Sequence, residues 1–363
     1  MKRREFVGGL AAAAGLSACA QENNNCLDGA NESRETFEWS CVTSWPPKFP
    51  GLGMAPENLA TRIEAATGGR LTIKVYGGGE LVPPFEVFDA VSRGTVEMGH
   101  GAGYYHKGKV DAAVFFTAIP FGMTNQELNG WMYYGGGLEL YQELYAPFDL
   151  VPFPTGNTGV QMGGWFNREI NSIDDLKGLK MRIPGLGGEV LRRAGGTPVT
   201  LPGAEIFTAL QTGAIDATEW VGPYNDASFG LHKAARYYYY PGWQEPGPGL
   251  ETIIHKAAWD SLPPDLKEVV RTSCQAITTD MAAEYTHGNA SSLAQLQQDP
   301  NIEIRRFPSD VLELLKSVAS DVIEDMMAND PMSQKIGTAY LDYLARVAAN
   351  TRLSDQAYLE TRT

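Results

Sequence analysis

Hydrophobic side chains follow two different spacings along the first hundred residues of the chain. In residues 70–76 they alternate with polar side chains, which predicts a strand, and a run of three glycines ends it. In residues 56–66 they recur every three or four positions, which predicts a helix. A short strand over 38–43, a helix over 85–92 and a strand that starts at 96 complete the pattern. Strand–helix–strand units are typical of a parallel sheet, so we expect an α/β fold.

One of these units has a second copy further along the chain. Residues 88–97 (Phe-Asp-Ala-Val-Ser-Arg-Gly-Thr-Val-Glu) align with residues 207–216 (Phe-Thr-Ala-Leu-Gln-Thr-Gly-Ala-Ile-Asp), and the spacing from phenylalanine to glycine is the same. In this register His100 falls opposite Glu219. The duplication predicts two lobes of similar build. Because ligands of open α/β sheets bind outside the carboxyl ends of the strands, we expect a ligand cleft between the lobes.

The C-terminal part of the chain is expected to be mostly helical. Hydrophobic spacing predicts helices from about residue 258 onward, and a helix over 125–145 that glycines at 135–137 break into two pieces. Strands are expected at 150–153 and 159–167. The predicted division is a signal peptide at 1–20, a flexible spacer at 21–35, lobe I at 36–155 plus 250–300, and lobe II with the C-terminal helices at 156–249 plus 301–363.

The first twenty residues have the features of an export signal. A basic start at Lys2-Arg3-Arg4 precedes an apolar run over 6–16. The paired arginines resemble a twin-arginine signal, and Leu16-Ser17-Ala18-Cys19 resembles a lipoprotein site at which Cys19 would carry the lipid. The apolar run covers about eleven residues, whereas a membrane span needs roughly 20. We therefore expect an exported protein, either free in the periplasm or anchored at Cys19.

Composition argues against a nucleic-acid partner. The formal net charge is −14, and the Lys and Arg side chains form no cluster of the kind that binds phosphates. The 4 cysteines, at positions 19, 26, 41 and 274, lack metal-binding spacing. Two alternatives remain open for them: a Cys26–Cys41 disulfide in an oxidising compartment, or unpaired thiols with Cys274 buried in a helix.

Two charged residues at predicted strand ends are the main candidates for chemistry. Arg182 lies just before Pro184-Gly185, where its guanidinium could bind a carboxylate through two parallel hydrogen bonds. Glu219 follows the apolar alternation of residues 215–218, and a desolvated carboxylate needs a cation, either a ligand ammonium or a metal ion. For each residue the alternative is a structural ion pair. Trp220 and one or two tyrosines are expected to line an apolar pocket wall beside them.

Signatures of catalysis are weak. The 5 histidines are scattered without the spacing of a zinc site, and the chain has no Gly-x-Ser-x-Gly motif. A retaining glycosidase, however, needs only two carboxylates about 5 Å apart. An exported carbohydrate-active hydrolase therefore stays as the alternative from another functional class.

Four stretches carry a resemblance to a known family. They are Thr43-Ser-Trp-Pro, Gly156-Asn-Thr-Gly-Val-Gln-Met-Gly-Gly-Trp-Phe-Asn167, Leu176-Lys-Gly-Leu-Lys-Met-Arg-Ile-Pro184 and Gly213-Ala-Ile-Asp-Ala-Thr-Glu-Trp220. With them, the chain from residue 37 onward resembles the extracellular solute receptors of TRAP (tripartite ATP-independent periplasmic) transporters. The second and fourth stretches resemble most closely the subgroup that binds 2-oxo acids such as pyruvate together with a metal cation.

The resemblance implies roles for individual residues. Arg182 would bind the ligand carboxylate, and the ligand-binding set would also include Tyr104, Tyr105, Asn157, Gln161 and Trp220. A sodium or calcium ion would be held by the side chains of Gln161 and Glu219 and by the backbone carbonyl of Trp220, which fits the preference of these ions for oxygen. Receptors for C4-dicarboxylates have an asparagine about where this chain has Trp220, so a dicarboxylate is disfavoured.

The resemblance also implies how the protein works. It would be a periplasmic binding protein and not an enzyme, with two lobes that close on the ligand and a helical C-terminal tail. The expected ligand is a pyruvate-like 2-oxo monocarboxylate, with lactate or another 2-hydroxy acid and calcium as the alternative. The expected partners are the TRAP membrane permease subunits and, through exchange of a C-terminal helix, a second copy of the chain.

Overall fold

The computed structural model describes residues 35–362. The predicted signal peptide, the predicted spacer apart from Glu35, Cys19 and Cys26 lie outside this range, and so does the last residue. The described residues form an α/β fold with two separate sheets, as the sequence predicts. No helix among them is long and apolar enough to cross a membrane.

The first sheet has the strand order β2-β1-β3-β10-β4. Strands β1 to β3 are parallel, whereas β10 runs antiparallel to both of its neighbours. The strands are β1 (Phe37–Thr43), β2 (Leu71–Tyr76), β3 (Met98–Gly101), β4 (Leu150–Asn157) and β10 (Gly249–His255). The helices next to them in sequence are α1 (Met54–Thr67), α2 (Val87–Ser92), α3 (Asn125–Tyr134), α4 (Gly137–Tyr145) and α8 (Lys256–Ser261). We call this sheet with these helices lobe I.

The second sheet has the strand order β11-β9-β5-β8-β6-β7. Its strands are β5 (Gly164–Phe166), β6 (Lys180–Arg182), β7 (Thr197–Val199), β8 (Ala217–Thr218), β9 (Tyr237–Tyr240) and β11 (Glu303–Arg306). The helices α5 (Gly185–Arg193), α6 (Gly203–Gln211) and α7 (Pro223–Phe229) connect them. We call this sheet with its helices lobe II. The two halves of the sequence duplication lie in different lobes, one leading through α2 into β3 and the other through α6 into β8.

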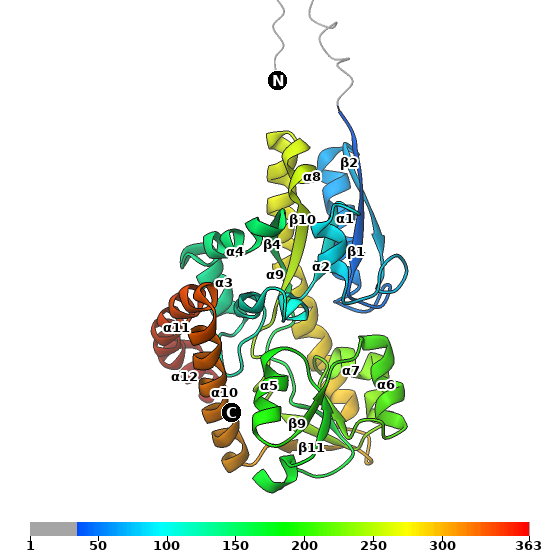
Figure 1. Ribbon diagram of the computed structural model, residues 1–363. Coiled ribbons are helices and arrows are strands. Elements are labelled where there is room, and N and C mark those ends of the chain that lie inside the picture. Colours follow the sequence, from blue (N-terminus) through cyan, green and yellow to red (C-terminus); the bar gives the residue numbers. More distant parts are fainter. Residues whose placement is uncertain (1–34, 363) are drawn as a thin grey trace, which may run out of the picture. The chain divides into compact units, whose positions relative to one another are not determined.

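Three segments connect the two sheets. The chain leaves lobe I after β4, returns between β9 and β10, and leaves again after α9 (Pro264–Leu296) for β11. Helix α9 packs against β4 and α1 of lobe I and against α7 of lobe II, as can be followed in Figure 1. Helix α9 therefore contacts both lobes.

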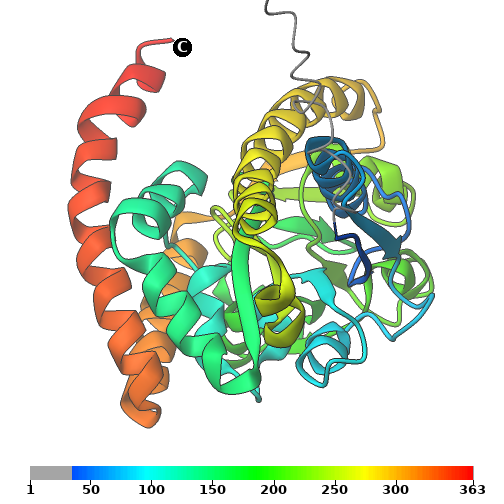
Figure 2. The same cartoon turned by 90° about the horizontal axis from the view of Figure 1, so that it is seen from above.

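The C-terminal tail consists of α10 (Ser309–Asn329), α11 (Pro331–Thr351), one π-helical turn (Arg352–Gln356) and α12 (Ala357–Glu360). Helix α10 packs on α5 of lobe II, whereas α11 packs on α3 and α4 of lobe I. The hydroxyl of Tyr340 in α11 accepts a hydrogen bond from the Met123 amide at 2.8 Å. The tail thus contacts both lobes. Figure 2 shows α11 and α12 as one continuous rod of helix.

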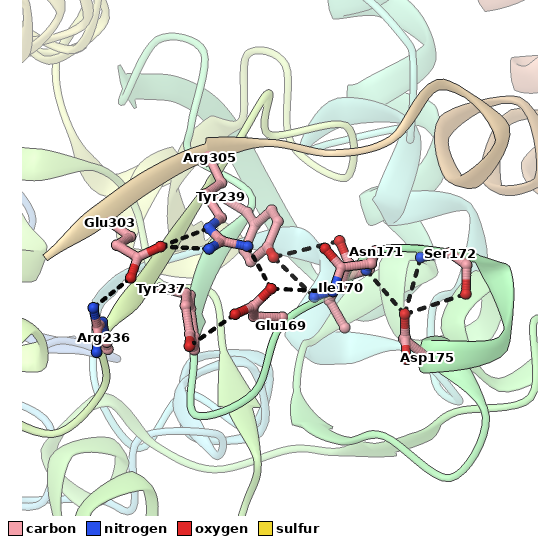
Figure 3. Close-up of polar contacts among 10 residues, drawn as sticks. All are labelled: Glu169, Ile170, Asn171, Ser172, Asp175, Arg236, Tyr237, Tyr239, Glu303 and Arg305. Carbon is pink, nitrogen blue, oxygen red and sulfur yellow. Dashed lines mark hydrogen bonds and ion pairs between the residues drawn. The ribbon is translucent and has the colours of Figure 1, made fainter.

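Strand β11 was not predicted, because Glu303 and Arg305 mask its alternation. Charged side chains hold it beside β9: Arg305 pairs with Glu303 and, at 2.7 Å, with Glu169, and Arg236 pairs with Glu303 at 2.5 Å (Figure 3). Tyr237 of β9 donates to Glu169 at 3.1 Å, as the same view shows. These surface ion pairs therefore add to the backbone pairing of β11 with β9 and to the packing of Ile304 against the hydrophobic core.

Within the described residues, Cys41 and Cys274 are free, buried thiols. Burial raises the pKa of Cys274 to about 12, so this thiol stays protonated. Cys41 lies fully buried in β1, in the middle of the hydrophobic core. Both described cysteines are therefore unpaired thiols, as one of the two alternatives predicts, and Cys26 of the other alternative lies outside the described residues.

Candidate ligand-binding site

Arg182 and Glu219 are brought together by neighbouring parallel strands. Strand β6 ends at Arg182, which is in register with Thr218 at the end of β8, so Glu219 follows at the same edge of the sheet. The Arg182 Nη1 atom forms an ion pair with the Glu219 carboxylate and also donates to its backbone carbonyl at 3.3 Å. Both side chains are at most 1% exposed. The two main candidates from the sequence thus form one buried charge pair.

A small cavity, which we call the inner cavity, lies beside this pair. It is lined by Trp45, Leu52, Tyr104, Tyr105, Thr158, Gln161, Arg182, Trp220, Val221, Glu245, Pro248 and Leu250. Both lobes contribute, as the sequence duplication predicted for the cleft. Its volume of about 10 Å³ leaves room for about one water molecule. A larger ligand therefore requires the residues that line the cavity to move apart.

Five of the six ligand-binding residues named from the sequence line the inner cavity, and Asn157 does not. Asn157 lines a neighbouring cavity with Phe116 and Leu128. Its side-chain amide donates to the Gly247 carbonyl at 3.0 Å, and its side-chain oxygen accepts from the Gly159 amide at 2.8 Å. Asn157 thus fastens the loop that carries Gln161 to the loop that carries Glu245.

Glu245 is a site residue that the sequence reasoning missed. It is buried in the loop between β9 and β10, and its carboxylate accepts a hydrogen bond from Gln161 Nε2 at 2.8 Å. The two backbones are also joined, because the Gln161 amide donates to the Glu245 carbonyl at 3.1 Å. Gly242 passes so close to Gln161 that a Cβ atom would lie 2.2 Å from the Gln161 carbonyl oxygen. The Pro- and Gly-rich composition of residues 241–249 signals a turn-rich loop, but spacing alone does not single out its carboxylate.

The two buried carboxylates are electrostatically different. Burial raises the pKa of Glu219 to about 7, against the lowering effect of the Arg182 guanidinium. Burial raises the pKa of Glu245 well above its usual range, and the nearby Glu219 adds to the rise. One guanidinium thus faces two carboxyl groups whose charged forms burial disfavours, and a bound cation would stabilise those charged forms.

Several buried polar atoms at the site have no hydrogen-bond partner among the described residues. They are Gln161 Oε1, Glu219 Oε2, Arg182 Nη2 and Trp220 Nε1. Buried polar groups are normally satisfied, so such atoms require an explanation. The two oxygens suit a hard cation such as sodium or calcium, and the free guanidinium nitrogen suits a carboxylate. The donor set therefore fits a metal cation bound next to an anionic ligand.

The two tyrosines reach the cavity from lobe I. They lie in a 3₁₀ turn (Gly103–His106) that directly follows β3. Burial raises the pKa of Tyr105 to about 12, although Arg182 lowers it, so the hydroxyl stays protonated and can donate to a ligand oxygen. His106 at the end of the turn bonds to the buried Glu251 at 2.7 Å, and Tyr145 donates to the same carboxylate at 2.8 Å. This network fixes the turn against lobe I.

Fold and site together define a class of protein. Two α/β lobes, connected by three crossing segments, place charged side chains of one lobe and tyrosines of the other around one small cavity. Residues 41–330 match the family described as bacterial extracellular solute-binding protein, family 7. The chain belongs to this family. It is accordingly a substrate-binding receptor of a TRAP transporter that acts in the periplasm, and the alternative of a hydrolytic enzyme is wrong.

The chain matches several similar proteins along nearly their whole length. The chain is 40% identical over 361 residues to the monocarboxylate 2-oxoacid-binding periplasmic protein of Nostoc sp. PCC 7120, covering 99% of this chain and 98% of that protein. A TRAP solute-binding protein from Colwellia psychrerythraea with bound calcium and pyruvate has a TM-score of 0.88 and 43% identity, over 90% of this chain and 100% of that one. One from Pseudoalteromonas atlantica with bound sodium and pyruvate has a TM-score of 0.87 and 44% identity, over 90% and 99%.

Proposed function

We propose that this receptor captures a small 2-oxo monocarboxylate, of which pyruvate is the type, together with a sodium or calcium ion, and delivers it to a TRAP membrane permease. The observation that carries the proposal is the set of unpartnered atoms in one place: a guanidinium nitrogen of Arg182 beside the free side-chain oxygens of Gln161 and Glu219. A 2-oxo acid offers a carboxylate to the first and oxygens to a cation held by the second. Two of the similar structures contain this combination.

Different residues of the site bind the carboxylate, hold the cation and close the cavity. Arg182 binds and orients the ligand carboxylate, while Trp220 packs under the guanidinium with its ring centroid 5.2 Å from the Arg182 carbon. Gln161 Oε1, the Glu219 carboxylate and the backbone carbonyl of Trp220 hold the cation. When bound, the cation draws the ligand oxygens to this side of the site and balances their charge. Tyr104 and Tyr105 close the site from lobe I.

The Arg182–Glu219 ion pair makes the two ligands depend on each other. A carboxylate that binds Arg182 alone leaves Glu219 as a buried, unpaired charge, and a cation that binds Glu219 alone leaves Arg182 unpaired. Each of these half-filled states is costly in a desolvated site. Both ligands together replace one internal ion pair by two, so carboxylate and cation are expected to bind cooperatively.

Ligand capture is coupled to lobe closure. The ligand contacts come from both lobes, so binding favours the arrangement in which Arg182 of lobe II and Tyr105 of lobe I face each other. Phe49 of lobe I stacks on Phe229 of lobe II with centroids 4.3 Å apart, and it meets the edge of Trp220 at 6.3 Å. These contacts supply a further reason for the lobes to stay closed around the ligand.

The C-terminal tail supports a homodimer as part of the proposal. The end of the tail carries large apolar side chains that are exposed in a single chain: Leu353 at 86%, Tyr358 at 65% and Leu359 at 53%. A partner copy that exchanges this helical segment would bury them. The twin-arginine signal and the lipid anchor at Cys19 remain predictions from the sequence.

A thermal-shift screen of 2-oxo and 2-hydroxy acids, each with and without sodium and calcium, tests the function. Pyruvate with a cation is expected to raise the melting temperature most. Greater stabilisation by lactate with calcium would favour the 2-hydroxy acid alternative. Arg182→Ala should abolish the stabilisation, whereas Arg271→Ala on the outer face of α9 should retain it. Undiminished stabilisation of Arg182→Ala would contradict the proposal.

A further inference from the structure

A second cavity adjoins the inner cavity and shares two residues with it. This outer cavity has a volume of about 620 Å³ and is lined by Phe85, Tyr104, Tyr105, Lys107, Gly108, Asp111, Ile183, Pro184, Gly185, Gly188, Glu189, Pro198 and Thr200. Only Tyr104 and Tyr105 line both cavities. The tyrosines therefore stand between a small charged cavity and a much larger one.

The ring of Tyr105 occupies the boundary itself. On one side it packs against Trp45, which lines only the inner cavity, with ring centroids 6.0 Å apart. On the other side it packs against Phe85, which lines only the outer cavity, with ring centroids 4.8 Å apart. A side chain that extends from the inner cavity toward the outer one must displace this ring.

The boundary is rigidly supported. Trp45 Nε1 donates to His100 Nδ1 at 2.8 Å, and His100 Nε2 donates to the Thr155 carbonyl at 2.9 Å. Burial lowers the pKa of His100 to about 4, so the ring stays neutral and both hydrogen bonds persist at neutral pH. On the lobe II side, a Cβ atom at Gly185, whose φ is +62°, would lie 3.3 Å from the Cβ of Tyr104. The Trp45 ring on which Tyr105 packs is thus held in place, and Gly185 lies close against Tyr104.

The outer cavity has walls that suit an apolar chain. Phe85, Ile183, Pro184 and Pro198 line it. Its two acidic residues have partners: Glu189 accepts from Arg192 at 3.0 Å, and Asp111 accepts from the Gly108 amide at 2.7 Å. Among the described residues, Lys107 is its one basic lining residue. Phe85, which packs against Tyr105, and the other apolar lining side chains offer hydrophobic contact, the kind that the side chain of a longer 2-oxo acid needs.

We propose that the Tyr105 ring is the specificity-determining partition of this receptor, which restricts it to short-chain 2-oxo acids by closing the inner cavity against the outer one. Without the ring, the outer cavity takes the aliphatic chain of a longer 2-oxo acid whose carboxylate stays on Arg182. The inference rests on the proposed function, because it presupposes that Arg182 binds the carboxylate.

The test is a ratio of affinities, measured by isothermal titration calorimetry with a saturating cation. The two ligands are pyruvate and 4-methyl-2-oxopentanoate, which differ in chain length but share the 2-oxo carboxylate. The wild type is expected to prefer pyruvate by at least about tenfold, and truncation by Tyr105→Ala or Tyr105→Leu is expected to shift the ratio toward the longer acid by at least about tenfold. The two truncations guard against a failure of one to fold.

Tyr105→Phe is the matched control, because it removes the hydroxyl and keeps the ring. Its ratio should stay that of the wild type, whatever happens to its absolute affinities. The inference is overturned if both truncations keep the wild-type ratio, if Tyr105→Phe shifts it as much as they do, or if the wild type binds both acids equally. If instead the proposed function is wrong, the wild type binds lactate in place of pyruvate. The ratio of affinities for a short and a long ligand is then measured with 2-hydroxy acids of the two chain lengths.

Discussion

Arg182 and Glu219 form a buried ion pair at the carboxyl ends of two adjacent parallel strands, β6 and β8. Each residue keeps one unsatisfied atom, Nη2 of Arg182 and Oε2 of Glu219. The group that would bind an anion, Arg182, and the group that would bind a cation, Glu219, therefore neutralise each other's charge directly.

Glu245 is expected to act as a positioning residue for the cation site. Its carboxylate accepts from Gln161 Nε2, which leaves Gln161 Oε1 free to contact a cation. Glu245→Leu removes this acceptor and should weaken the affinity for the cation about 10- to 100-fold, as loss of such supporting hydrogen bonds commonly does. Glu245→Gln retains an acceptor oxygen and should lose much less. Calcium titration followed by intrinsic tryptophan fluorescence measures both variants, and equal losses would contradict the positioning role.

Phe49 is expected to contribute to ligand affinity without touching the ligand. It connects lobe I to Phe229 and Trp220 of lobe II, and aromatic pairs of this kind contribute about 0.5–1.5 kcal/mol beyond their burial. Phe49→Ala should weaken pyruvate binding about tenfold by favouring the open arrangement of the lobes. Phe148→Ala, which alters an aromatic contact within lobe I, is the control. Calorimetry gives the affinities, and an unchanged affinity in Phe49→Ala would refute the coupling.

Asp226 is expected to make the stability of the protein depend on pH. It accepts hydrogen bonds from Tyr238 at 2.7 Å, Trp165 at 3.1 Å and the Val221 amide at 3.2 Å, next to the loop that carries Trp220. Burial raises the pKa of Asp226 from its ordinary 3.8 to about 6, although these hydrogen bonds oppose the rise. Between pH 4 and 6 the folded state therefore holds a proton that the unfolded state has lost, so the free energy of unfolding falls as pH rises.

Replacement of the Asp226 carboxyl group tests the direction of this pH dependence. Asp226→Asn cannot ionise, so the unfolding free energy of the wild type minus that of this variant should fall by on the order of 3 kcal/mol from pH 4 to pH 7. Asp280→Asn, at an exposed position of α9, should keep a constant difference. Urea unfolding at several pH values measures both. A constant difference for Asp226→Asn would show that its pKa is not raised in the folded protein.

The exposed apolar end of the tail is expected to decide the oligomeric state. Leu353→Gln, Tyr358→Ser and Leu359→Gln together remove the apolar surface that a partner copy would cover. The wild type should sediment as a dimer and the triple variant as a monomer with unaltered pyruvate affinity, because these residues lie outside both cavities. A wild type that sediments as a monomer at micromolar concentration would contradict the proposed dimer.

The sequence predicts the two-lobed α/β fold of this protein better than the side-chain contacts within its binding site. Arg182 and Glu219 could be found because each lies at a predicted strand end, Arg182 just before Pro184-Gly185 and Glu219 after the alternation of residues 215–218. The duplication then predicted a cleft between two lobes. Glu245 could not be found, since its position depends on how the loop after β9 folds back onto Gln161. The ion pair between Arg182 and Glu219 was left open for the same reason: spacing along the chain does not say which side chains of two adjacent strands meet.

Asn157 and the C-terminal tail show a second limit. Asn157 lies only four residues from Gln161, yet the turn between them directs its amide into backbone contacts on the other side of the loop. The hydrophobic spacing of residues 332–349 predicts a helix but not the surface against which it packs. The structure places this helix on α3 and α4 of lobe I. Both outcomes depend on tertiary contacts between distant segments.

The cooperative binding of carboxylate and cation is tested most directly by calorimetry. The affinity for pyruvate is measured as a function of cation concentration, in the wild type and in Glu219→Gln. Calcium or sodium is expected to strengthen pyruvate binding by the wild type at least about tenfold, a coupling of about 1.4 kcal/mol, and this coupling should disappear in Glu219→Gln. Glu268→Gln, on the exposed side of α9, should behave as the wild type. Pyruvate binding by the wild type that is indifferent to both cations would contradict the exchange of the Arg182–Glu219 pair for two ligands.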